Sequence, residues 1–314
     1  MKKIFVLSKS NIDLAKQEVL SLANTCKFEL IDNLLILDSS KNLYDRLGLS
    51  HYEYEFLFKS SIKDIEKKTQ EFDWNKIYKE NFYVETKGVN KTKEFSSIIY
   101  SRLKSPKVKL KNSKTHITFF FKEKKVVVGK LVSEIDKSFL KRKAHLRPQL
   151  HPTSLHPGLA RACINLSGLK KGKFLDPFCG SGGILIEAGL MGFDVIGYDI
   201  DKIQIKRAKQ NLEHYKIQEF KLEVKDATKI KGKYDLIVTD LPYGKNSIAL
   251  KTTELYLKFL KNTEKLTKNF LIIFPDKKLA KSLIQKTNWK IKNHLSQYVH
   301  KSMTREIFNL VLSD

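Results

Sequence analysis

Four aspartates in the second half of the sequence follow short runs that read as strands. They are Asp176, Asp199, Asp226 and Asp240. Because ligands of an open parallel sheet bind outside the carboxyl ends of its strands, we expect these four carboxylates to face one crevice. A carboxylate in that place repels a pyrophosphate but suits a ligand that carries an ammonium or a sulfonium group.

The first aspartate opens a glycine-rich loop, Asp176 to Gly183, with the sequence DPFCGSGG. Three glycines within four positions allow backbone N–H groups to approach a ligand at a helix N-terminus. The loop departs from the dinucleotide fingerprint G-x-G-x-x-G, because the sixth position counted from Gly180 is Leu185. Asp199 follows at about the 20-residue distance at which such folds hold ribose hydroxyls. Taken alone, the loop is also compatible with a simple tight turn between a strand and a helix.

The segment Asp240-Leu241-Pro242-Tyr243 has the residue types that could activate an amine. The exocyclic amine of a nucleobase is a poor nucleophile, because its lone pair is drawn into the ring. Asp240 and the main-chain carbonyl of Leu241, held by the fixed φ of Pro242, can accept its hydrogens, and Tyr243 offers a ring for stacking. Beside a sulfonium methyl donor, such an amine reacts through positioning and proton acceptance. The alternative is an Asx-turn with a buried tyrosine.

The elements that must position these residues alternate between strand and helix. Strands are expected at residues 173–175, 195–198, 220–225, 236–239 and 270–274, and helices at residues 159–166, 184–190, 253–266 and 277–285. Two consecutive strands, near 291–299 and 307–312, end the sequence. This order predicts an α/β fold with a doubly wound, mostly parallel sheet that carries an antiparallel hairpin at its edge.

The first half of the sequence predicts two smaller α+β units. The first has a strand at 3–7, a helix at 11–22 and a hairpin at 27–37. The second has strands at 52–59 and 81–86, helices at 61–71 and 93–103, and a hairpin made by 115–121 and 126–129. At 314 residues, two or three domains are expected.

The charge of the chain indicates a polyanionic partner. The sequence has 59 Lys and Arg against 34 Asp and Glu, a net charge of +25. Residues 101–150 alone hold 15 Lys and Arg against 3 Asp and Glu, including Lys141, Arg142, Lys143 and Arg147. A solvated face without a partner is the alternative, but a dense basic block beside a nucleotide-type site is typical of phosphate-backbone binding. The proline-rich segment 146–158 that follows reads as a linker.

Metal and membrane sites are not expected. The three cysteines form no C-x-x-C pair, and His151 and His156 have no further cluster with zinc-type spacing. The cysteine usage suits a reducing compartment. No run approaches the ~18 apolar residues of a membrane span. We therefore expect a cytoplasmic protein without a metal, and a monomer.

Several of these motifs resemble those of a known family. The loop from Asp176, Asp199, Asp226 and the segment from Asp240 are similar to the S-adenosyl-L-methionine-dependent amino-methyltransferases. Arg147-Pro148, the SLHP and LARA motifs at 154–157 and 159–162, and HKSMTR at 300–305 resemble the archaeal tRNA guanine-N2 methyltransferases acting at position 10. The resemblance covers essentially the whole chain. One position departs: the family usually has proline where this chain has Leu241, and a role carried by a backbone carbonyl tolerates that change.

The resemblance implies a Rossmann-like methyltransferase domain at 159–314 behind a linker at 146–158. It also implies an N-terminal ferredoxin-like unit at 1–50 and a THUMP-like RNA-binding domain at 51–145. Its cofactor is S-adenosyl-L-methionine and its partner is tRNA. The implied cofactor-binding residues are Asp176, Pro177, Phe178, Gly180, Gly182, Asp199, Ile200, Asp226, Ala227 and Asp240. The implied catalytic residues are Asp240, Leu241, Pro242 and Tyr243, and the implied tRNA-binding residues are Lys141, Arg142, Lys143 and Arg147.

Other functions remain open from the sequence. The same tetrad serves DNA adenine-N6 methyltransferases, and guanine-N2 methylation could fall on another tRNA position or on rRNA. A third class is a non-catalytic RNA-binding protein with a decayed enzyme fold. The presence of all four aspartates argues against this class.

Overall fold

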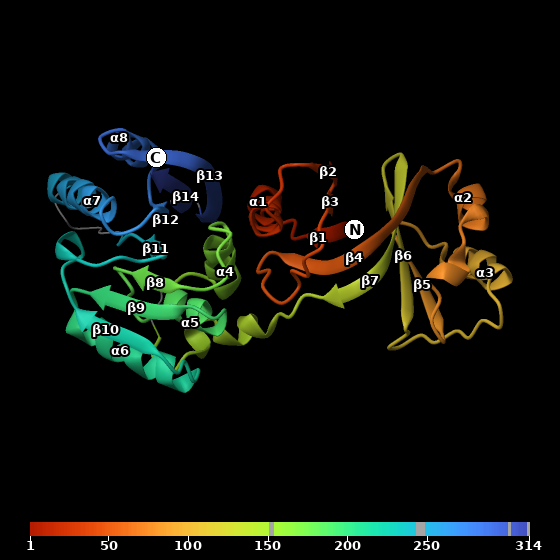
Figure 1. Cartoon of the computed structure of the whole chain (residues 1–314), viewed down its shortest axis with the longest axis horizontal. Helices are drawn as coiled ribbons and strands as arrows, with labels where there is room; N and C mark the ends of the chain where they lie inside the picture. Colours follow the sequence, from red (N-terminus) through yellow and green to blue (C-terminus); the bar gives the residue numbers. More distant parts are fainter. Residues whose placement is uncertain (151–153, 243–248, 301–302, 313–314) are drawn as a thin grey trace. The chain divides into compact units, whose positions relative to one another are not determined.

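The computed structural model describes residues 1–150, 154–242, 249–300 and 303–312 (Figure 1). The chain forms two compact units. Unit 1 consists of Met1–Lys9, Thr25–Asp45 and Ser50–Ile135. Unit 2 consists of Ser10–Asn24, Arg46–Leu49 and Asp136–Asp314. Each unit is built on one mixed sheet, so the predicted α/β class is confirmed.

Unit 1 has a seven-stranded sheet in the order β2-β3-β1-β4-β7-β6-β5. Its strands are β1 (Lys2–Leu7), β2 (Phe28–Ile31), β3 (Leu34–Asp38), β4 (Ser50–Ser61), β5 (Phe82–Lys87), β6 (Thr115–Lys122) and β7 (Lys125–Glu134). The predicted hairpins at 27–37 and 115–129 are present as β2–β3 and β6–β7. The long strand β4 pairs with β1 on one side and with β7 on the other. The strands of the two expected N-terminal units therefore share one sheet.

The helices of unit 1 pack on the half of the sheet that contains β5 and β6. They are α2 (Ile65–Glu71) and α3 (Thr92–Arg102), with a short 3₁₀ turn, η1 (Trp74–Lys76). Trp74 is fully buried among Phe58, Phe95 and Phe119, and its Nε1 donates to the carbonyl of Thr69 at 2.7 Å. Since β5 and β6 are parallel and α3 connects them, this part is a βαβ crossover.

Unit 2 has a second seven-stranded sheet in the order β10-β9-β8-β11-β12-β14-β13. Its strands are β8 (Lys173–Asp176), β9 (Asp194–Asp199), β10 (Phe220–Val224), β11 (Leu236–Asp240), β12 (Asn269–Phe274), β13 (Trp289–His300) and β14 (Met303–Leu312). The first five strands in the sheet order are parallel, and β14 and β13 are antiparallel. This is the predicted doubly wound sheet with an edge hairpin.

Helices cover both faces of this sheet (Figure 1). One face carries α4 (Pro157–Asn165), α5 (Gly183–Leu190) and α6 (Lys202–His214), and the other carries α7 (Ala249–Thr263) and α8 (Lys277–Ile284). Each face of the sheet packs against its helices in a separate hydrophobic core, and alternate strand residues point to opposite faces. Phe174 and Val238 pack toward α4 and α5, whereas Leu175 and Ile237 pack toward α7. Short 3₁₀ turns are η2 (Ser138–Arg142), η3 (Ala144–Leu146) and η4 (Ala227–Lys229). In the described residues, no helix has the length and apolar character needed to span a bilayer.

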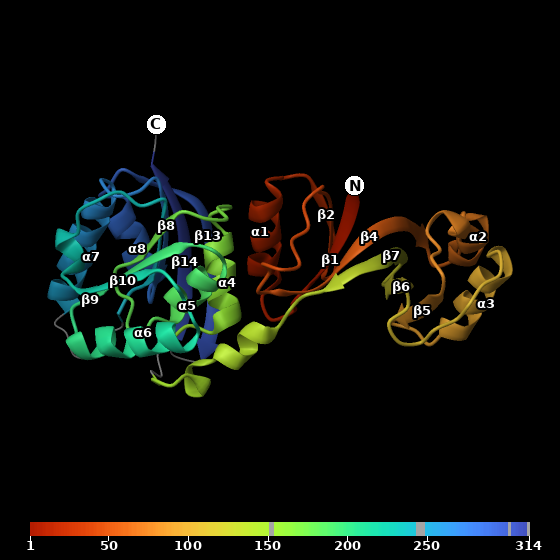
Figure 2. The same cartoon turned by 60° about the horizontal axis from the view of Figure 1, so that its bottom comes forward.

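Two N-terminal segments belong to unit 2 rather than to unit 1. Helix α1 (Ile12–Ala23) lies beside α4 in both views (Figure 2). Its fully buried Glu18 accepts hydrogen bonds from the N–H groups of Gly48 and Leu49 at 2.7 and 3.0 Å and from Nδ2 of Asn165 at 2.8 Å. This buried carboxylate fixes α1 and the segment 46–49 against α4. Unit 2 therefore includes segments that precede residue 159 in the sequence.

Candidate active site

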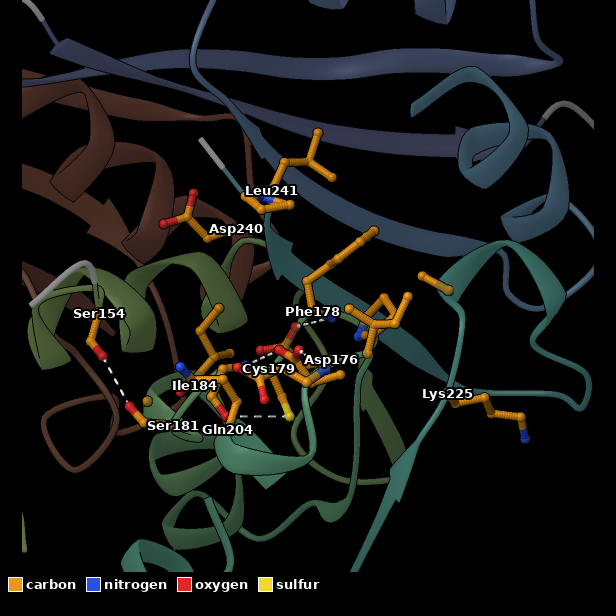
Figure 3. A pocket seen from close by; sticks show the side chains of 18 of the residues that line it. Ser154, Asp176, Phe178, Cys179, Ser181, Ile184, Gln204, Lys225, Asp240 and Leu241 are labelled. Atoms are coloured by element: carbon orange, nitrogen blue, oxygen red, sulfur yellow. Dashed lines mark hydrogen bonds between the residues drawn. The ribbon is translucent and has the colours of Figure 1, made fainter. Parts of the chain in front are cut away.

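The carboxyl edge of the parallel strands in unit 2 lines a cavity of about 480 Å³ (Figure 3). All four strand-end aspartates, Asp176, Asp199, Asp226 and Asp240, lie in its wall. The predicted residues that line it with them are Pro177, Phe178, Gly180, Ile200, Ala227, Leu241 and Pro242. The wall therefore combines carboxylates with apolar side chains, as the sequence pattern predicted.

Asp176 ends β8 and is 1% exposed. Its Oδ1 accepts hydrogen bonds from the N–H of Phe178 at 3.2 Å and from Oγ1 of Thr239 at 2.7 Å. Burial, together with the nearby charges of Asp199 and Asp240, raises the pKa of Asp176 to about 7, although these hydrogen bonds oppose the shift. A cationic ligand beside this carboxyl would stabilise its ionised form.

The glycine loop has a backbone that favours glycine at two positions. Gly180 and Gly182 have φ values of +51° and +84°, the left-handed region. Gly182 lies just behind the cavity rather than in its wall, and its N–H donates to the carbonyl of Cys179 at 2.8 Å. Gly183 begins α5, and a Cβ there would lie 2.7 Å from Nη1 of Arg147. The third glycine thus makes room for a guanidinium.

Asp199 ends β9 and holds the glycine loop. Its Oδ2 accepts the N–H of Gly180 at 2.9 Å, and its Oδ1 accepts the N–H of Asp201 at 3.0 Å. The next residue, Ile200, is 77% exposed although it lines the cavity. An exposed apolar side chain beside a carboxylate suits the flat face of a nucleobase whose ribose the carboxylate holds.

Asp226 follows β10, and its side chain caps the turn that contains Ala227. Its Oδ1 accepts from the N–H and the Oγ1 of Thr228 at 2.9 and 2.7 Å. These hydrogen bonds, those from Thr228 first, lower the pKa of Asp226. Asp226 is therefore ionised at neutral pH at the rim of the cavity.

The predicted tetrad begins at the end of β11, and three of its four residues are described. Asp240 is partly buried, and its Oδ2 lies 3.4 Å from Nε of Arg305. The side chain of Leu241 is buried in the core below α7, so only its backbone can face a ligand. The carbonyl of Pro242 accepts a hydrogen bond from the hydroxyl of Tyr256 at 2.6 Å, which fixes the chain at this point. Tyr243 lies outside the described residues.

The sequence did not predict several residues that form or support the cavity. Ser154 and Ser181 line the cavity with their hydroxyls 3.3 Å apart. The buried Asn211 of α6 donates to the carbonyls of Ser181 and Gln149 at 2.9 and 3.0 Å, and so ties the glycine loop to the segment before α4. Ser154 stands within the SLHP motif, which was the signal that could have identified it. Asn211 and Tyr256 have no such signal, because their roles depend on tertiary contacts.

Two of the four residues predicted to bind tRNA are engaged inside unit 2. Arg142 forms a bidentate ion pair with the buried Glu187, with N–O distances of 2.7 and 2.8 Å. Arg147 is 5% exposed, and its Nε donates to the carbonyl of Arg142 at 2.8 Å. In contrast, Lys141 is exposed and Lys143 is partly exposed. Sequence alone cannot separate such cations, because burial depends on the partner that α5 supplies.

The two histidines considered for a metal have different outcomes. His151 lies outside the described residues. His156 caps helix α4, since its Nδ1 accepts the N–H of Gly158 at 3.2 Å. Within the part of the chain that the structure describes, no group of three His, Cys, Asp or Glu side chains is arranged to hold a metal ion.

The cavity fits S-adenosyl-L-methionine. Its acidic wall, with Asp176 fully buried in it, complements a ligand that carries both an ammonium and a sulfonium charge. Its apolar wall, with Phe178, Ile184 and Ile200, can cover an adenine ring. When bound, this cofactor supplies an electrophilic methyl group on its sulfonium.

Comparison with known proteins identifies the family. A family profile described as an RMKL-like methyltransferase domain matches residues 144–307. A DNA methylase profile matches residues 17–210, a span that ends before β11. The chain is 32% identical over 98% of its length to a tRNA (guanine(10)-N2)-dimethyltransferase of Methanothermobacter thermautotrophicus, and the match covers 98% of that protein. It is 34% identical over 88% of its length to the protein of the same name from Pyrococcus abyssi, covering 89% of that protein.

Solved structures agree on the fold. The structure of TrmN from Thermus thermophilus covers all of both chains with a TM-score of 0.53 and 18% identity. A methyltransferase crystallised with S-adenosylhomocysteine covers all of this chain and 98% of its own, with a TM-score of 0.51 and 13% identity. At these identities the likeness concerns the Rossmann-like fold alone. From its close relatives and the matched domain, the chain is an S-adenosyl-L-methionine-dependent RMKL-like methyltransferase, and it belongs to the family of the archaeal tRNA (guanine(10)-N2)-dimethyltransferases.

Proposed function

We propose that this enzyme transfers one or two methyl groups from S-adenosyl-L-methionine to the exocyclic N2 of guanosine 10 in tRNA. The observation that carries the proposal is the placement of Asp240 and Pro242 at the end of β11, in the same cavity wall as Asp176 and Asp199. An amine acceptor and a cofactor site thus share one cavity. The names of the relatives supply the substrate and the position.

We assign the cofactor to the glycine loop and the strand ends. Asp199 would accept hydrogen bonds from the ribose hydroxyls, and Ile200 and Ala227 would flank the adenine beside Asp226. The buried Asp176 would face the cationic end. The backbone of Gly180 and the turn at Pro177 and Phe178 would close the remaining wall, and Gly182 would support the loop from behind.

The amine chemistry falls to the tetrad. The ionised Asp240 and the main-chain carbonyl of Leu241 accept hydrogen bonds from the two hydrogens of N2, which turns the nitrogen lone pair out of conjugation. The bound cofactor would supply the methyl group and leave as S-adenosylhomocysteine, since its bond between sulfur and the methyl carbon breaks as N2 bonds to that carbon. One N–H bond of N2 would then break, and Asp240 would take the proton. Tyr243 would stack on the extruded guanine, as aromatic side chains do in enzymes that act on a flipped base. Pro242, anchored by Tyr256, keeps the carbonyl of Leu241 in place.

We propose that residues 1–145 bind tRNA, with a ferredoxin-like unit at 1–50 and a THUMP-like domain at 51–145. The support is an exposed basic segment on unit 1. Backbone hydrogen bonds of 2.9 and 3.0 Å tie residues 107 and 109 to Phe82 on the edge strand β5. The side chains of Lys107, Lys109 and Lys111 around this anchor are exposed. Lys141 in η2 and Lys143 just after it, both in unit 2, are the further proposed tRNA contacts.

The binding proposal predicts a steep salt dependence, because each phosphate neutralised by a lysine releases counterions. Replacing Lys107, Lys109 and Lys111 together with alanine should lower the slope of log K against log salt by about 2 to 3. Replacing Lys278, Lys281 and Lys286 near α8 is a matched control of equal charge. Equal tRNA affinity and equal slope in the parent and the 107–111 variant, measured by filter binding, would remove this segment from the interface.

The activity is tested by mass spectrometry of nucleosides after incubation with the methyl donor and either unmodified tRNA or duplex DNA. We expect N2-methylguanosine and N2,N2-dimethylguanosine from tRNA. N6-methyladenine from DNA would support the second candidate, which the DNA methylase match favours. Absence of cofactor binding by isothermal titration would instead support a non-catalytic RNA-binding protein.

Two further proposals concern the setting of the enzyme. A cytoplasmic location follows from the tRNA substrate and the three free cysteines. A monomeric state is the simplest arrangement, since unit 2 supplies all the described residues of the cavity. Light scattering of the purified protein, with and without tRNA, tests the second point.

A further inference from the structure

Arg305 forms an ion pair with the proposed catalytic carboxylate. Its Nε lies 3.4 Å from Oδ2 of Asp240, and the two side chains are 11% and 15% exposed. Neither the composition nor the spacing of the sequence predicted that these residues would meet. Since both side chains are largely removed from water, their charges interact more strongly than those of a surface pair.

The edge hairpin brings Arg305 to this position. Strand β11 pairs in parallel with β12, with Asp240 opposite Ile273. Strand β12 pairs with β14 in the antiparallel direction, and Phe274 opposite Glu306 is the last pair. Arg305 directly precedes Glu306 in β14. It therefore lies just beyond the carboxyl end of β12, beside Asp240. On its other side Arg305 pairs with Gln297 of β13. The antiparallel hairpin thus places a cation at the carboxyl edge of the parallel strands.

Three other described groups lie within reach of the charge of Asp240. The charge of Asp240 acts on Asp176 of β8, on the Cys163 thiol of α4 and on the Tyr256 hydroxyl of α7. Asp240 and burial both raise the pKa of each of these groups, to about 7 for Asp176 and about 12 for Tyr256. These three groups are acidic or neutral, whereas Arg305 of β14 supplies a positive charge against Asp240.

We propose that Arg305 is a positioning residue that keeps Asp240 ionised and fixes the orientation of its carboxylate toward the exocyclic amine. The inference rests on the proposed role of Asp240. A carboxyl group can take the proton of the amine only when it is ionised, and the negative charge of the neighbouring Asp176 favours its protonation. Arg305 opposes that effect from the β14 side. Its guanidinium remains charged at every pH at which the enzyme works, so the support does not titrate away.

The direct test measures the ionisation of Asp240 in the whole protein, without any substrate. The protein is labelled with ¹³C at aspartate carboxyls, and the signal of Asp240 is identified by its loss in Asp240→Asn. We expect the titration midpoint of this signal to rise by about 1 to 3 pH units in Arg305→Gln, because a neighbouring arginine lowers a carboxyl pKa by that amount. Arg305→Lys keeps a positive charge, so the midpoint of this variant should stay close to that of the parent protein. Lys292→Ala, which removes a cation from exposed β13, is the matched control and should leave the midpoint unchanged.

The second readout is the pH profile of single-turnover methylation of tRNA. In Arg305→Gln the acid limb should move to higher pH by the same interval, and the rate should recover as the pH rises toward 9. The dissociation constant of S-adenosyl-L-methionine should stay within about threefold of the parent, because Arg305 does not line the cavity. A merely structural arginine would lower the rate at every pH. Arg305→Met is a second neutral variant, should the glutamine variant fail to fold.

The outcomes separate this inference from the proposed function. An Asp240 midpoint that is the same in the parent and in both neutral variants overturns the role of Arg305, whatever the substrate is. If Asp240→Ala methylates tRNA as fast as the parent, the proposed role of Asp240 itself fails. A shifted midpoint with a rate loss that high pH does not recover would leave Arg305 as a structural residue and refute the positioning role.

Discussion

Asp199 offers a prediction whose size can be worked out from its contacts. Its two carboxylate oxygens accept the N–H groups of Gly180 and Asp201 at 2.9 and 3.0 Å, so it holds the glycine loop as well as the proposed ribose hydroxyls. A hydrogen bond to a charged group contributes about 1.5 to 3 kcal/mol. Asp199 is partly exposed, and water can replace part of what the variant Asp199→Ala loses. Two such bonds to the ribose hydroxyls, with about half of their strength replaced by water, give a net loss of about 1.5 to 3 kcal/mol. The dissociation constant for S-adenosyl-L-methionine should therefore rise about 10- to 150-fold.

The assay is isothermal titration of the folded variant with S-adenosyl-L-methionine and with S-adenosylhomocysteine. Asp199→Asn keeps one acceptor oxygen and should show an intermediate loss. Asp194→Ala is the matched control, because Asp194 is an exposed aspartate at the opposite end of the same strand β9. Binding of tRNA should be nearly unchanged in all three variants. A dissociation constant within twofold of the parent in a folded Asp199→Ala protein would refute the assignment of the cofactor to this carboxylate.

Three further predictions follow from the same unit. Asp240→Ala should lower kcat about 10²- to 10⁴-fold with a smaller change in KM, because a proton acceptor is lost. Single-turnover methylation measures this effect. A near-parental kcat would mean that the segment 240–243 is only a turn. Gly183→Ala should displace the Arg147 guanidinium and lower the free energy of unfolding by about 1 to 3 kcal/mol. Urea unfolding measures this loss. An unchanged midpoint of urea unfolding would show that Arg147 moves aside without cost. Burial raises the pKa of Glu18 from 4.5 to about 7, so its contribution to stability is present below about pH 4.5 and is lost as the pH rises through 7. The free energy of unfolding lost over this pH range is about 3 kcal/mol. Glu18→Gln should remove this contribution to the pH dependence of unfolding. The same pH dependence in the variant and the parent would contradict the assignment to Glu18.

The acidic wall of the cavity was predictable because parallel strands leave a strong sequence pattern. The strands β8, β9 and β11 have apolar interiors, and the aspartate that ends each of them must stand at the carboxyl edge. Asp176, Asp199, Asp226 and Asp240 therefore meet in one wall without any knowledge of the helices between them. The edge hairpin followed from two consecutive strands at the end of the chain.

Tertiary partners explain what the sequence could not provide. The amphipathic helix α1 was expected, but nothing in its periodicity shows that Glu18 would be buried against Gly48 and Asn165 of unit 2. Likewise, Arg142 reads as one more cation in a basic stretch until Glu187 of α5 is placed beside it. Arg305 meets Asp240 only because β14 pairs with β12 in one register. These contacts depend on long-range register, which local patterns do not encode.

The measurement that tests the central claim most directly uses a tRNA in which guanosine 10 is replaced by inosine. Inosine keeps the ring and the sugar of guanosine but lacks the N2 amine that Asp240 is proposed to engage. The parent protein is incubated with labelled S-adenosyl-L-methionine and with each tRNA, and incorporation is followed under single-turnover conditions. The proposed mechanism predicts methylation of the guanosine tRNA and none of the inosine tRNA, with both RNAs bound equally well. Equal methyl incorporation into the two tRNAs would contradict it.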